Sequence, residues 1–160
     1  MAFSDSSFQY CPDNGRSTGA YIIFYQGGTI DHVINFPGPF SKSSAEMNYN
    51  AAFTSGTALA HFKMLIHGLL NKDPDIVPEE APVIILDSKA STCMAKNGKD
   101  TKYTRRIYGR VYFGRNGEKC KIHKIDWCEG GLQLADIATG NVGENDLNPR
   151  MRYIIVRLDN

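Results

Sequence analysis

Residues 83–86, Val-Ile-Ile-Leu, restrict the possible folds of this chain more than any other segment. A short uninterrupted apolar run is typical of a strand that is buried on both faces, as in a parallel sheet covered by helices. It follows a segment, 43–70, in which we expect a long helix, and a loop with three prolines at 71–82. Such a strand returns to the sheet by a helical crossover, so we expect it to be parallel to the first strand.

The segments on either side complete the predicted sheet. Residues 1–8 predict a strand, and 20–26 with 29–36 predict a hairpin whose tight turn places Gly27 and Gly28 at its two positive-φ positions. Later segments predict helices over 88–98 (ended by Gly98) and 102–113, a strand over 117–128, and a short helix over 129–139. The expected fold is mixed α/β, a five-stranded mixed sheet with helices on both faces, in one domain covering 1–160 with an unassigned tail from about 141.

Composition excludes several functional classes. The 160 residues carry a net charge of +1, so the chain is not a strongly basic nucleic-acid arm, although local patches can still bind phosphate. Its apolar runs are too short to cross a bilayer, and it opens without a signal peptide. Its cysteines, without metal-type spacing, predict free thiols: Cys11, Cys93, Cys120 and Cys128. We therefore expect an intracellular protein, in a cytoplasmic particle or the nucleus, with no membrane partner.

Three aspartates are candidates for one site. Asp87 directly follows the apolar run, at the crevice where α/β folds bind ligands, but an aspartate there can also cap the next helix. Asp5 lies in a predicted strand, where aspartate is disfavoured unless it faces solvent. Asp136 lies near the start of the last helix, where an acid also complements the helix dipole.

The predicted topology brings these three acids together. Two lie on strands that are expected to be neighbours, and the third lies on a helix that returns to the sheet. Converging carboxylates repel one another unless cations lie between them. Oxygen ligands without histidine or cysteine suit Mg²⁺ or Mn²⁺, and two such ions can support phosphodiester cleavage.

Six motifs, in order, resemble the ribonuclease H domain of copia-type retrotransposon polyproteins: FSDSSF, GRSTGAY, SSAEMNY, VIILDSKAS, MAKN and QLADIAT. The resemblance runs from about residue 3 to about 140. It implies the ribonuclease H fold and cleavage of the RNA strand of RNA–DNA hybrids. In the family, four acids hold two metal ions for this reaction. Three of these acids match Asp5, Asp87 and Asp136. It also implies a chain that was once tethered to a reverse transcriptase, and so a part in reverse transcription.

The fourth acid is ambiguous. The family usually has two glutamates here; the first matches Glu46, and the second, expected to hold metal, is replaced by Asn48. On a helix these two positions point about 200° apart, so they cannot share one role. The helix face that carries Asn48 continues through small and apolar residues, which suit packing on a sheet. Ser43 and Glu46 fit a capping box. We therefore assign Asn48 to the active site and keep Glu46 as the competing candidate.

The resemblance and local chemistry also suggest substrate contacts. A hybrid duplex is read by shape, ribose hydroxyls and phosphates rather than by base sequence. Serines near the acids could reach ribose hydroxyls, and a turn and a basic run could reach phosphates; the basic run could equally be a solvated helix face. These candidates are Ser6, Ser43 and Ser44, then Arg16, Ser17 and Thr18, then Lys102, Arg105 and Arg106.

Three functions remain open at this point. The first is a hybrid-specific endoribonuclease of retroelement origin. The second is a hybrid-binding module of the same fold that cuts weakly or not at all, because an uncharged Asn48 replaces a ligand glutamate. The third is a nuclease of the same fold that acts on DNA.

Overall fold

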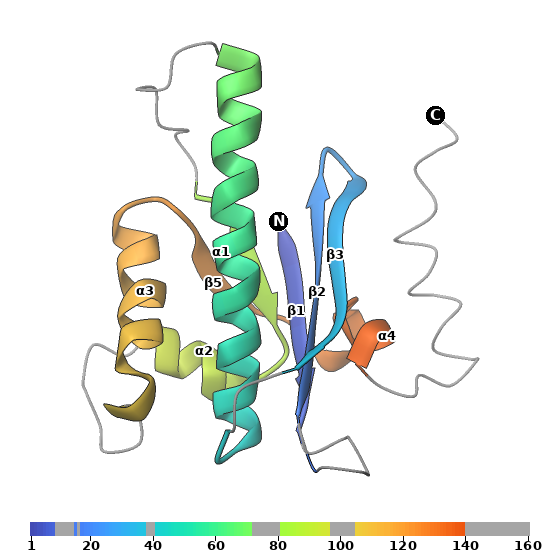
Figure 1. Cartoon of the computed structure of the whole chain (residues 1–160), viewed down its shortest axis with the longest axis vertical. Coiled ribbons are helices and arrows are strands. Elements are labelled where there is room, and N and C mark those ends of the chain that lie inside the picture. The colour runs from blue at the N-terminus through green and yellow to red at the C-terminus, as the bar shows by residue number, and fades with distance from the viewer. Residues whose placement is uncertain (9–14, 16, 38–40, 72–80, 97–104, 140–160) are drawn as a thin grey trace.

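The five strands form one mixed sheet in the order β3-β2-β1-β4-β5 (Figure 1). The computed structural model describes residues 1–8, 15, 17–37, 41–71, 81–96 and 105–139. β1 (Ala2–Ser7), β2 (Thr18–Tyr25) and β3 (Gly28–Pro37) are antiparallel neighbours, as the meander predicts. β4 (Val83–Leu86) is parallel to β1, and β5 (Lys124–Trp127) is parallel to β4. The expected mixed α/β fold class is confirmed.

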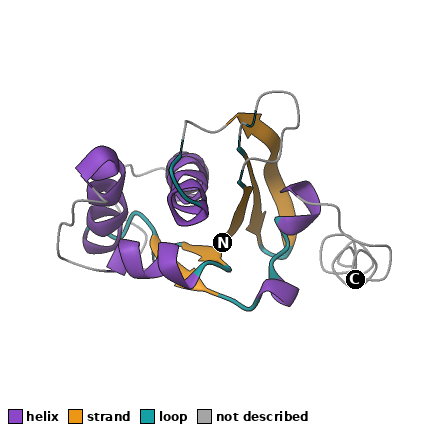
Figure 2. Cartoon of the chain, turned by 90° about the horizontal axis from the view of Figure 1, so that it is seen from below, coloured by secondary structure: helices purple, strands orange, loops and turns teal. Residues whose placement is uncertain are grey.

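Helices cover both faces of this sheet. The long helix α1 (Ser44–Asn71) and the short helix α4 (Asp136–Thr139) lie on opposite sides of β1–β3 (Figure 2). α2 (Lys89–Lys96), the single turn η1 (Arg105–Ile107) and α3 (Tyr108–Lys119) follow β4, and α2 and α3 both pack against α1. Another single turn, η2 (Gly130–Leu132), precedes α4.

The hydrophobic core lies between α1 and the sheet. Ile23, Ile84, Leu86 and Ile125 from the strands meet Ala52 and Leu59 from α1 and Val111 from α3. The face of α1 that continues from Asn48 is buried, as its small residues predict, with Ala51, Ala52 and Ser55 almost fully enclosed. Small side chains let the helix axis approach the sheet closely, which places the N-terminal turn of α1 beside β1.

The α1–α3 contact depends on glycine. The Tyr49 hydroxyl donates hydrogen bonds to the carbonyl oxygens of Arg110 (3.2 Å) and Val111 (3.4 Å) in α3. A methyl group on Gly114 would overlap that hydroxyl, and one on Gly117 would overlap the buried His123 ring. Tyr49 is the neighbour of Asn48, so this contact also locates the candidate site.

Three details differ from the expectations. The hairpin turn uses Gln26 (φ 49°) and Gly27 (φ 85°), not Gly27 and Gly28, because Tyr25 pairs with Gly28. α3 runs on to Lys119, so the expected strand over 117–128 is reduced to β5. The expected helix over 129–139 is broken, because Gln133 has extended backbone (φ −77°, ψ 104°) between η2 and α4.

Other expectations have mixed outcomes. Among the described residues, Cys93, Cys120 and Cys128 form no disulfide, as expected, whereas Cys11 and the helix end at Gly98 lie outside the described residues. Within the described ranges, no helix has the length and apolar character needed to span a membrane.

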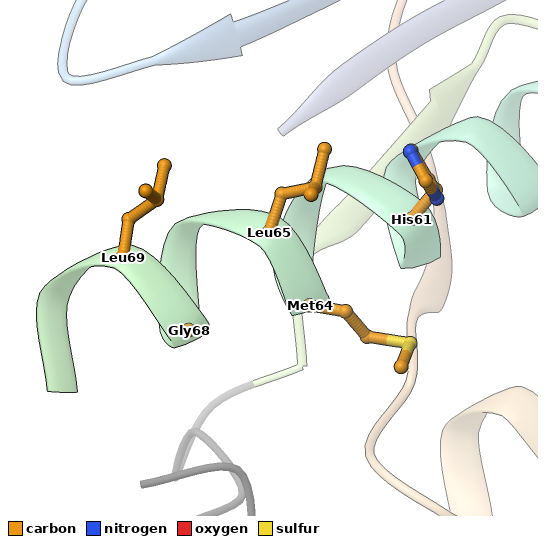
Figure 3. A pocket seen from close by; sticks show the side chains of 5 residues that line it. All are labelled: His61, Met64, Leu65, Gly68 and Leu69. Carbon is orange, nitrogen blue, oxygen red and sulfur yellow. The ribbon is translucent and has the colours of Figure 1, made fainter. Parts of the chain in front are cut away.

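The C-terminal half of α1 continues beyond the sheet (Figure 1). Several of its apolar side chains are exposed. Met64 is 75% and Leu69 is 79% exposed. With His61, Leu65 and Gly68 they line a shallow hollow (Figure 3). At 1.5 Å per residue, this hollow begins about 20 Å along the helix from Asn48, so it is not part of the acidic site.

We predict that Gly114→Ala lowers the free energy of unfolding by about 1–3 kcal/mol, because the added methyl group displaces the buried Tyr49 hydroxyl. Gly109→Ala in the same helix is the matched control, since a methyl group there meets nothing within 4 Å. It should leave stability unchanged or raise it by up to about 1 kcal/mol. Urea denaturation measures both, and equal effects would contradict the packing argument.

Candidate metal centre

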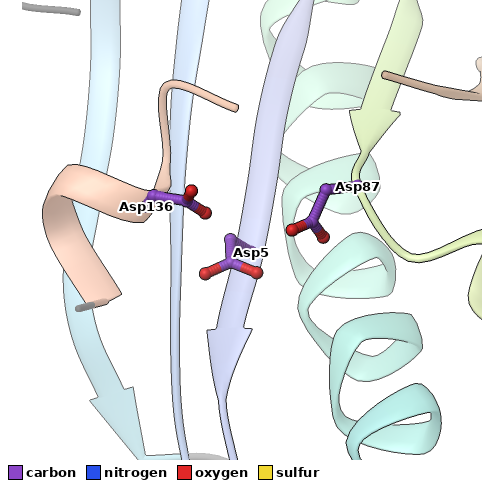
Figure 4. Close-up of side chains that lie close together, drawn as sticks. All are labelled: Asp5, Asp87 and Asp136. Atoms are coloured by element: carbon purple, nitrogen blue, oxygen red, sulfur yellow. The ribbon is translucent and has the colours of Figure 1, made fainter. Parts of the chain in front are cut away.

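Three aspartates from separate parts of the chain meet at one end of the sheet. Asp5 lies in β1, Asp87 directly follows β4, and Asp136 is the first residue of α4. One carboxylate oxygen from each lies within 4.8 Å of the other two, with Asp5 in the middle (Figure 4). The sequence predicted this meeting from the parallel pairing of β1 and β4, which the structure contains.

Asp5 is held inside the protein, not on a solvent-facing strand position. It is 8% exposed and pairs with Ala20 of β2. The Thr139 hydroxyl of α4 donates a hydrogen bond to its Oδ2 atom. The next residue, Ser6, points to the other face, where its hydroxyl bonds Asn48 of α1. Alternation along β1 therefore directs Asp5 to α4 and Ser6 to α1.

Asp87 is not the cap of the following helix. The hydroxyl of Ser88 accepts the backbone N–H of Ser91 (3.2 Å) and so fills the N-cap position of α2. The Asp87 main-chain carbonyl accepts a hydrogen bond from the indole N–H of Trp127 (2.8 Å). The half-buried Asp87 side chain turns to Asp5 (Figure 4).

The surroundings of Asp5 disfavour its charged form. Burial raises its pKa to about 7, and the negative charges of Asp136 and Asp87 act in the same direction. Hydrogen bonds from the Thr139 hydroxyl and the Ser6 backbone N–H lower the pKa but do not offset the burial. A proton on Asp5, or a cation among the three carboxylates, relieves the repulsion.

The donor set of this group fits a hard divalent cation. It consists of carboxylate oxygens from Asp5, Asp87 and Asp136, with no histidine or cysteine in the group that the described residues form. Such oxygen sets suit Mg²⁺ and Mn²⁺ better than zinc or copper. The three aspartates can therefore hold a divalent ion in place of the proton on Asp5.

Glu46 and Asn48 have different surroundings. The Ser43 hydroxyl accepts the Glu46 N–H (3.2 Å), and the buried Glu46 carboxylate accepts the Lys42 N–H (3.0 Å), which is a cap at the start of α1. The Asn48 amide oxygen accepts the Ser6 hydroxyl (2.9 Å), one residue along β1 from Asp5. Asn48 thus lies against β1 while Glu46 turns back to its own helix end.

The suggested substrate contacts are spread over several surroundings. Ser6 is half-buried, Ser44 and Arg105 are exposed, and Ser43 serves as the cap described above. Ser17 is buried, and Thr18 begins β2 opposite Ser7. Arg16 and Lys102, and the side chain of Arg106, lie outside the described residues.

Three residues that contact the acidic segments were not singled out from the sequence. Gln133 bonds main-chain carbonyls of β1 and β4. Thr139 bonds the Asp5 side chain, and Trp127 bonds the Asp87 carbonyl. Gln133 and Thr139 flank Asp136 by three residues on each side, which is the signal available in the sequence. Their partners, however, lie far along the chain.

Comparison with known proteins supports the fold. No protein-family model and no curated protein matches the chain. Among solved structures, it is similar to RNase H1 from the halophilic archaeon Halobacterium salinarum NRC-1, with a TM-score of 0.52 and 12% identity. The likeness covers 86% of this chain and 91% of that one. The chain has the ribonuclease H fold. At this identity the likeness speaks for the fold, so the chemistry must be argued from the site.

We predict that the metal-free protein loses stability as pH rises. The pKa of Asp5 is about 7 in the folded protein and about 3.8 in the unfolded chain. The protonated form of Asp5 therefore contributes to the free energy of unfolding fully below about pH 4, and this contribution is lost as pH rises through 7. Asp5→Asn removes this penalty. Its stability relative to the parent should therefore increase from pH 4 to pH 8.5, by at most about 4 kcal/mol at 1.4 kcal/mol per pKa unit.

Urea denaturation in EDTA at four pH values between 4 and 8.5 measures this difference. The exposed Asp126, which forms an ion pair with Lys96 (3.2 Å), provides the control variant Asp126→Asn. Its effect should be small and should not grow as pH rises through 7. A constant difference between Asp5→Asn and the parent would contradict the assigned burial of Asp5.

Proposed function

We propose that this chain is a ribonuclease H, an endonuclease that hydrolyses the RNA strand of RNA–DNA hybrids with two divalent metal ions. The observation that carries the proposal is the meeting of Asp5, Asp87 and Asp136 within 4.8 Å on this fold. Mg²⁺ or Mn²⁺ bound there would supply an activated water and would stabilise the charge on the departing 3′ oxygen.

The protein's own residues provide the binding and the orientation. Asp5 lies on the central strand of the sheet, and the Thr139 hydroxyl restrains one of its two carboxylate oxygens. Trp127 restrains the main chain at Asp87. Because both acids are fixed before ligand arrives, little ordering remains to be done when metal and substrate bind.

Asn48 lowers the charge of the proposed site. We place it at the fourth ligand position because the family resemblance has a ligand glutamate there and because Asn48 bonds Ser6, the residue after Asp5 on β1, whereas Glu46 is engaged in the helix cap. An amide oxygen can ligate Mg²⁺ but contributes no negative charge. The site then has three carboxylates instead of four, which weakens metal binding and slows cleavage without affecting the fold.

Substrate binding in this proposal relies on ribose and phosphate contacts. In this proposal the hydroxyls of half-buried Ser6 and exposed Ser44 contact ribose, and the exposed cation of Arg105 contacts phosphate. Contacts of this kind bind the hybrid through its backbone and its shape. Hybrid binding should therefore weaken as salt concentration rises.

The retroelement origin is a further part of the proposal. It is supported by the six ordered motifs, which resemble copia-type polyproteins and include GRSTGAY, SSAE and QLADI. In that setting the chain would be tethered to a reverse transcriptase. Sequencing the transcript upstream of the Met1 codon tests this: an in-frame reverse-transcriptase domain supports it, and a stop codon argues against it.

One observation favours a second function, a hybrid-binding module with weak or no cleavage. The uncharged Asn48 is bonded to the Ser6 hydroxyl through the oxygen that would have to face a metal ion. Loss of a ligand charge weakens metal binding more than it weakens contacts with the sugar-phosphate backbone of the hybrid. The two functions differ in whether the chain cuts hybrid when Mn²⁺ is plentiful.

We predict that Asn48→Glu raises the rate of hybrid cleavage at least about tenfold, which corresponds to about 1.4 kcal/mol of barrier. Adding Asp87→Asn to that variant should abolish cleavage, because a ligand charge is removed. The assay is cleavage of an end-labelled RNA–DNA hybrid in Mg²⁺ and in Mn²⁺, with all-DNA and all-RNA duplexes as specificity controls.

Glu46→Gln is the matched control for the helix-face assignment. It should lower the free energy of unfolding by about 1 kcal/mol through the weakened cap and leave the cleavage rate unchanged. If Glu46→Gln abolishes cleavage while Asn48→Glu has no effect, the assignments of these two residues are reversed. Cutting of all-DNA duplex instead of hybrid would replace the proposed substrate.

A further inference from the structure

Gln133 is an uncharged residue with direct bonds to the segments that carry the acids. Its side chain is buried, with 0% of the residue exposed, in the extended stretch between η2 and α4. The Nε2 atom donates to the carbonyl oxygens of Ser4 (3.0 Å) and Ile85 (3.4 Å). The Oε1 atom accepts the backbone N–H of Ala135 (3.3 Å).

Each of these three partners lies just before an acid. Ser4 directly precedes Asp5, Ala135 directly precedes Asp136, and Ile85 lies two residues before Asp87. One carboxamide therefore joins the three chain segments whose carboxylates meet.

The bonds lie where the pairing of the two strands ends. The parallel ladder between β1 and β4 has the pairs Ala2↔Ile84 and Phe3↔Ile85, so Ser4 is one residue past the last pair. Beyond this point the Gln133 side chain connects the two strands. The relative placement of Asp5 and Asp87 then depends on where that side chain holds their main chains.

We infer that Gln133 is the positioning residue of the metal centre, which sets the spacing of the three carboxylates without touching metal or substrate. The inference rests on the proposed function, because it concerns the same site. The chemistry requires this side chain: a carboxamide offers two N–H donors and an acceptor, whereas glutamate lacks the donors, lysine lacks the acceptor and methionine lacks both.

The main test compares Mn²⁺ affinity between the parent and Gln133→Met, which has similar length and no hydrogen-bonding amide. Isothermal titration calorimetry gives the dissociation constant. Trp127 fluorescence provides a second signal, because it is the chain's single tryptophan and bonds the Asp87 carbonyl. We expect Mn²⁺ to bind at least about tenfold more weakly to the variant, as for other residues that orient metal ligands.

Asn50→Leu is the matched control. Asn50 is another buried side-chain amide, 2% exposed, that accepts from Arg110 (2.7 Å) and donates to Ser41 (3.0 Å). Its replacement should lower stability while leaving the Mn²⁺ dissociation constant unchanged. A loss of Mn²⁺ affinity in Asn50→Leu equal to that in Gln133→Met would show general loosening and overturn the inference.

The outcomes separate this inference from the proposed function. If the parent binds Mn²⁺ and Gln133→Met binds it equally well, the positioning role is wrong and the nuclease proposal stands. If Gln133→Met binds weakly but the parent cuts no hybrid, the positioning role stands and the nuclease proposal fails. If the parent binds no Mn²⁺, both fail.

If Gln133→Met does not fold, an experiment on the parent protein tests the inference. Binding and positioning are reciprocal, so Mg²⁺ must strengthen the Gln133 hydrogen bonds by the factor by which those bonds strengthen Mg²⁺ binding. In NMR spectra we expect exchange of the Gln133 side-chain amide protons to slow at least about tenfold on Mg²⁺ addition. Exchange that is unchanged by Mg²⁺ at saturation overturns the inference.

Discussion

The burial of Asp5 beside two other carboxylates is the constraint on which the rest of this structure depends. Three like charges within 4.8 Å oppose folding unless a proton or a cation neutralises part of them. Asp5 cannot move away, because it lies on the central strand between β2 and β4. The raised pKa of Asp5 and the fit to a hard cation both follow from this arrangement.

The same constraint explains why neutral polar side chains surround the acids. Thr139 donates to the Asp5 carboxylate, and Trp127 and Gln133 donate to main-chain carbonyls beside the acids. None of these three adds charge: Thr139 restrains the Asp5 carboxylate, and Trp127 and Gln133 restrain the main chain beside the acids. The acidic segments are therefore held in place while their charge stays available to a ligand.

The position of α1 determines where Asn48, the uncharged residue assigned to the proposed site, lies. Small residues let the helix approach the sheet, Tyr49 fills the space at Gly114, and the Ser91 hydroxyl bonds the Ala45 carbonyl (2.8 Å) to join α2 to the start of α1. Asn48 is carried on this rigid support. In the proposed function, changing its side chain alters the charge of the site more than its geometry, so the proposed difference between nuclease and binding module is electrostatic.

Much of this could be predicted from the sequence, because it depends on local patterns. Alternating and apolar runs indicated the five strands, parallel pairing brought Asp5 and Asp87 together, and the S-x-x-E pattern indicated the cap at Glu46. The errors arose where tertiary contacts override local preference. Gln26 adopts a positive φ because strand register places it in the turn, and the last helix breaks because the Gln133 side chain bonds two strands.

The sequence by itself determined which elements form and which acids are available. Only the tertiary structure decided which neutral residues hold those acids. Gln133 and Ser4 are 129 positions apart in the chain, and Thr139 and Asp5 are 134 apart. Hydrogen bonds over such separations leave no periodic pattern in the sequence, because they exist only after the sheet and its helices have packed.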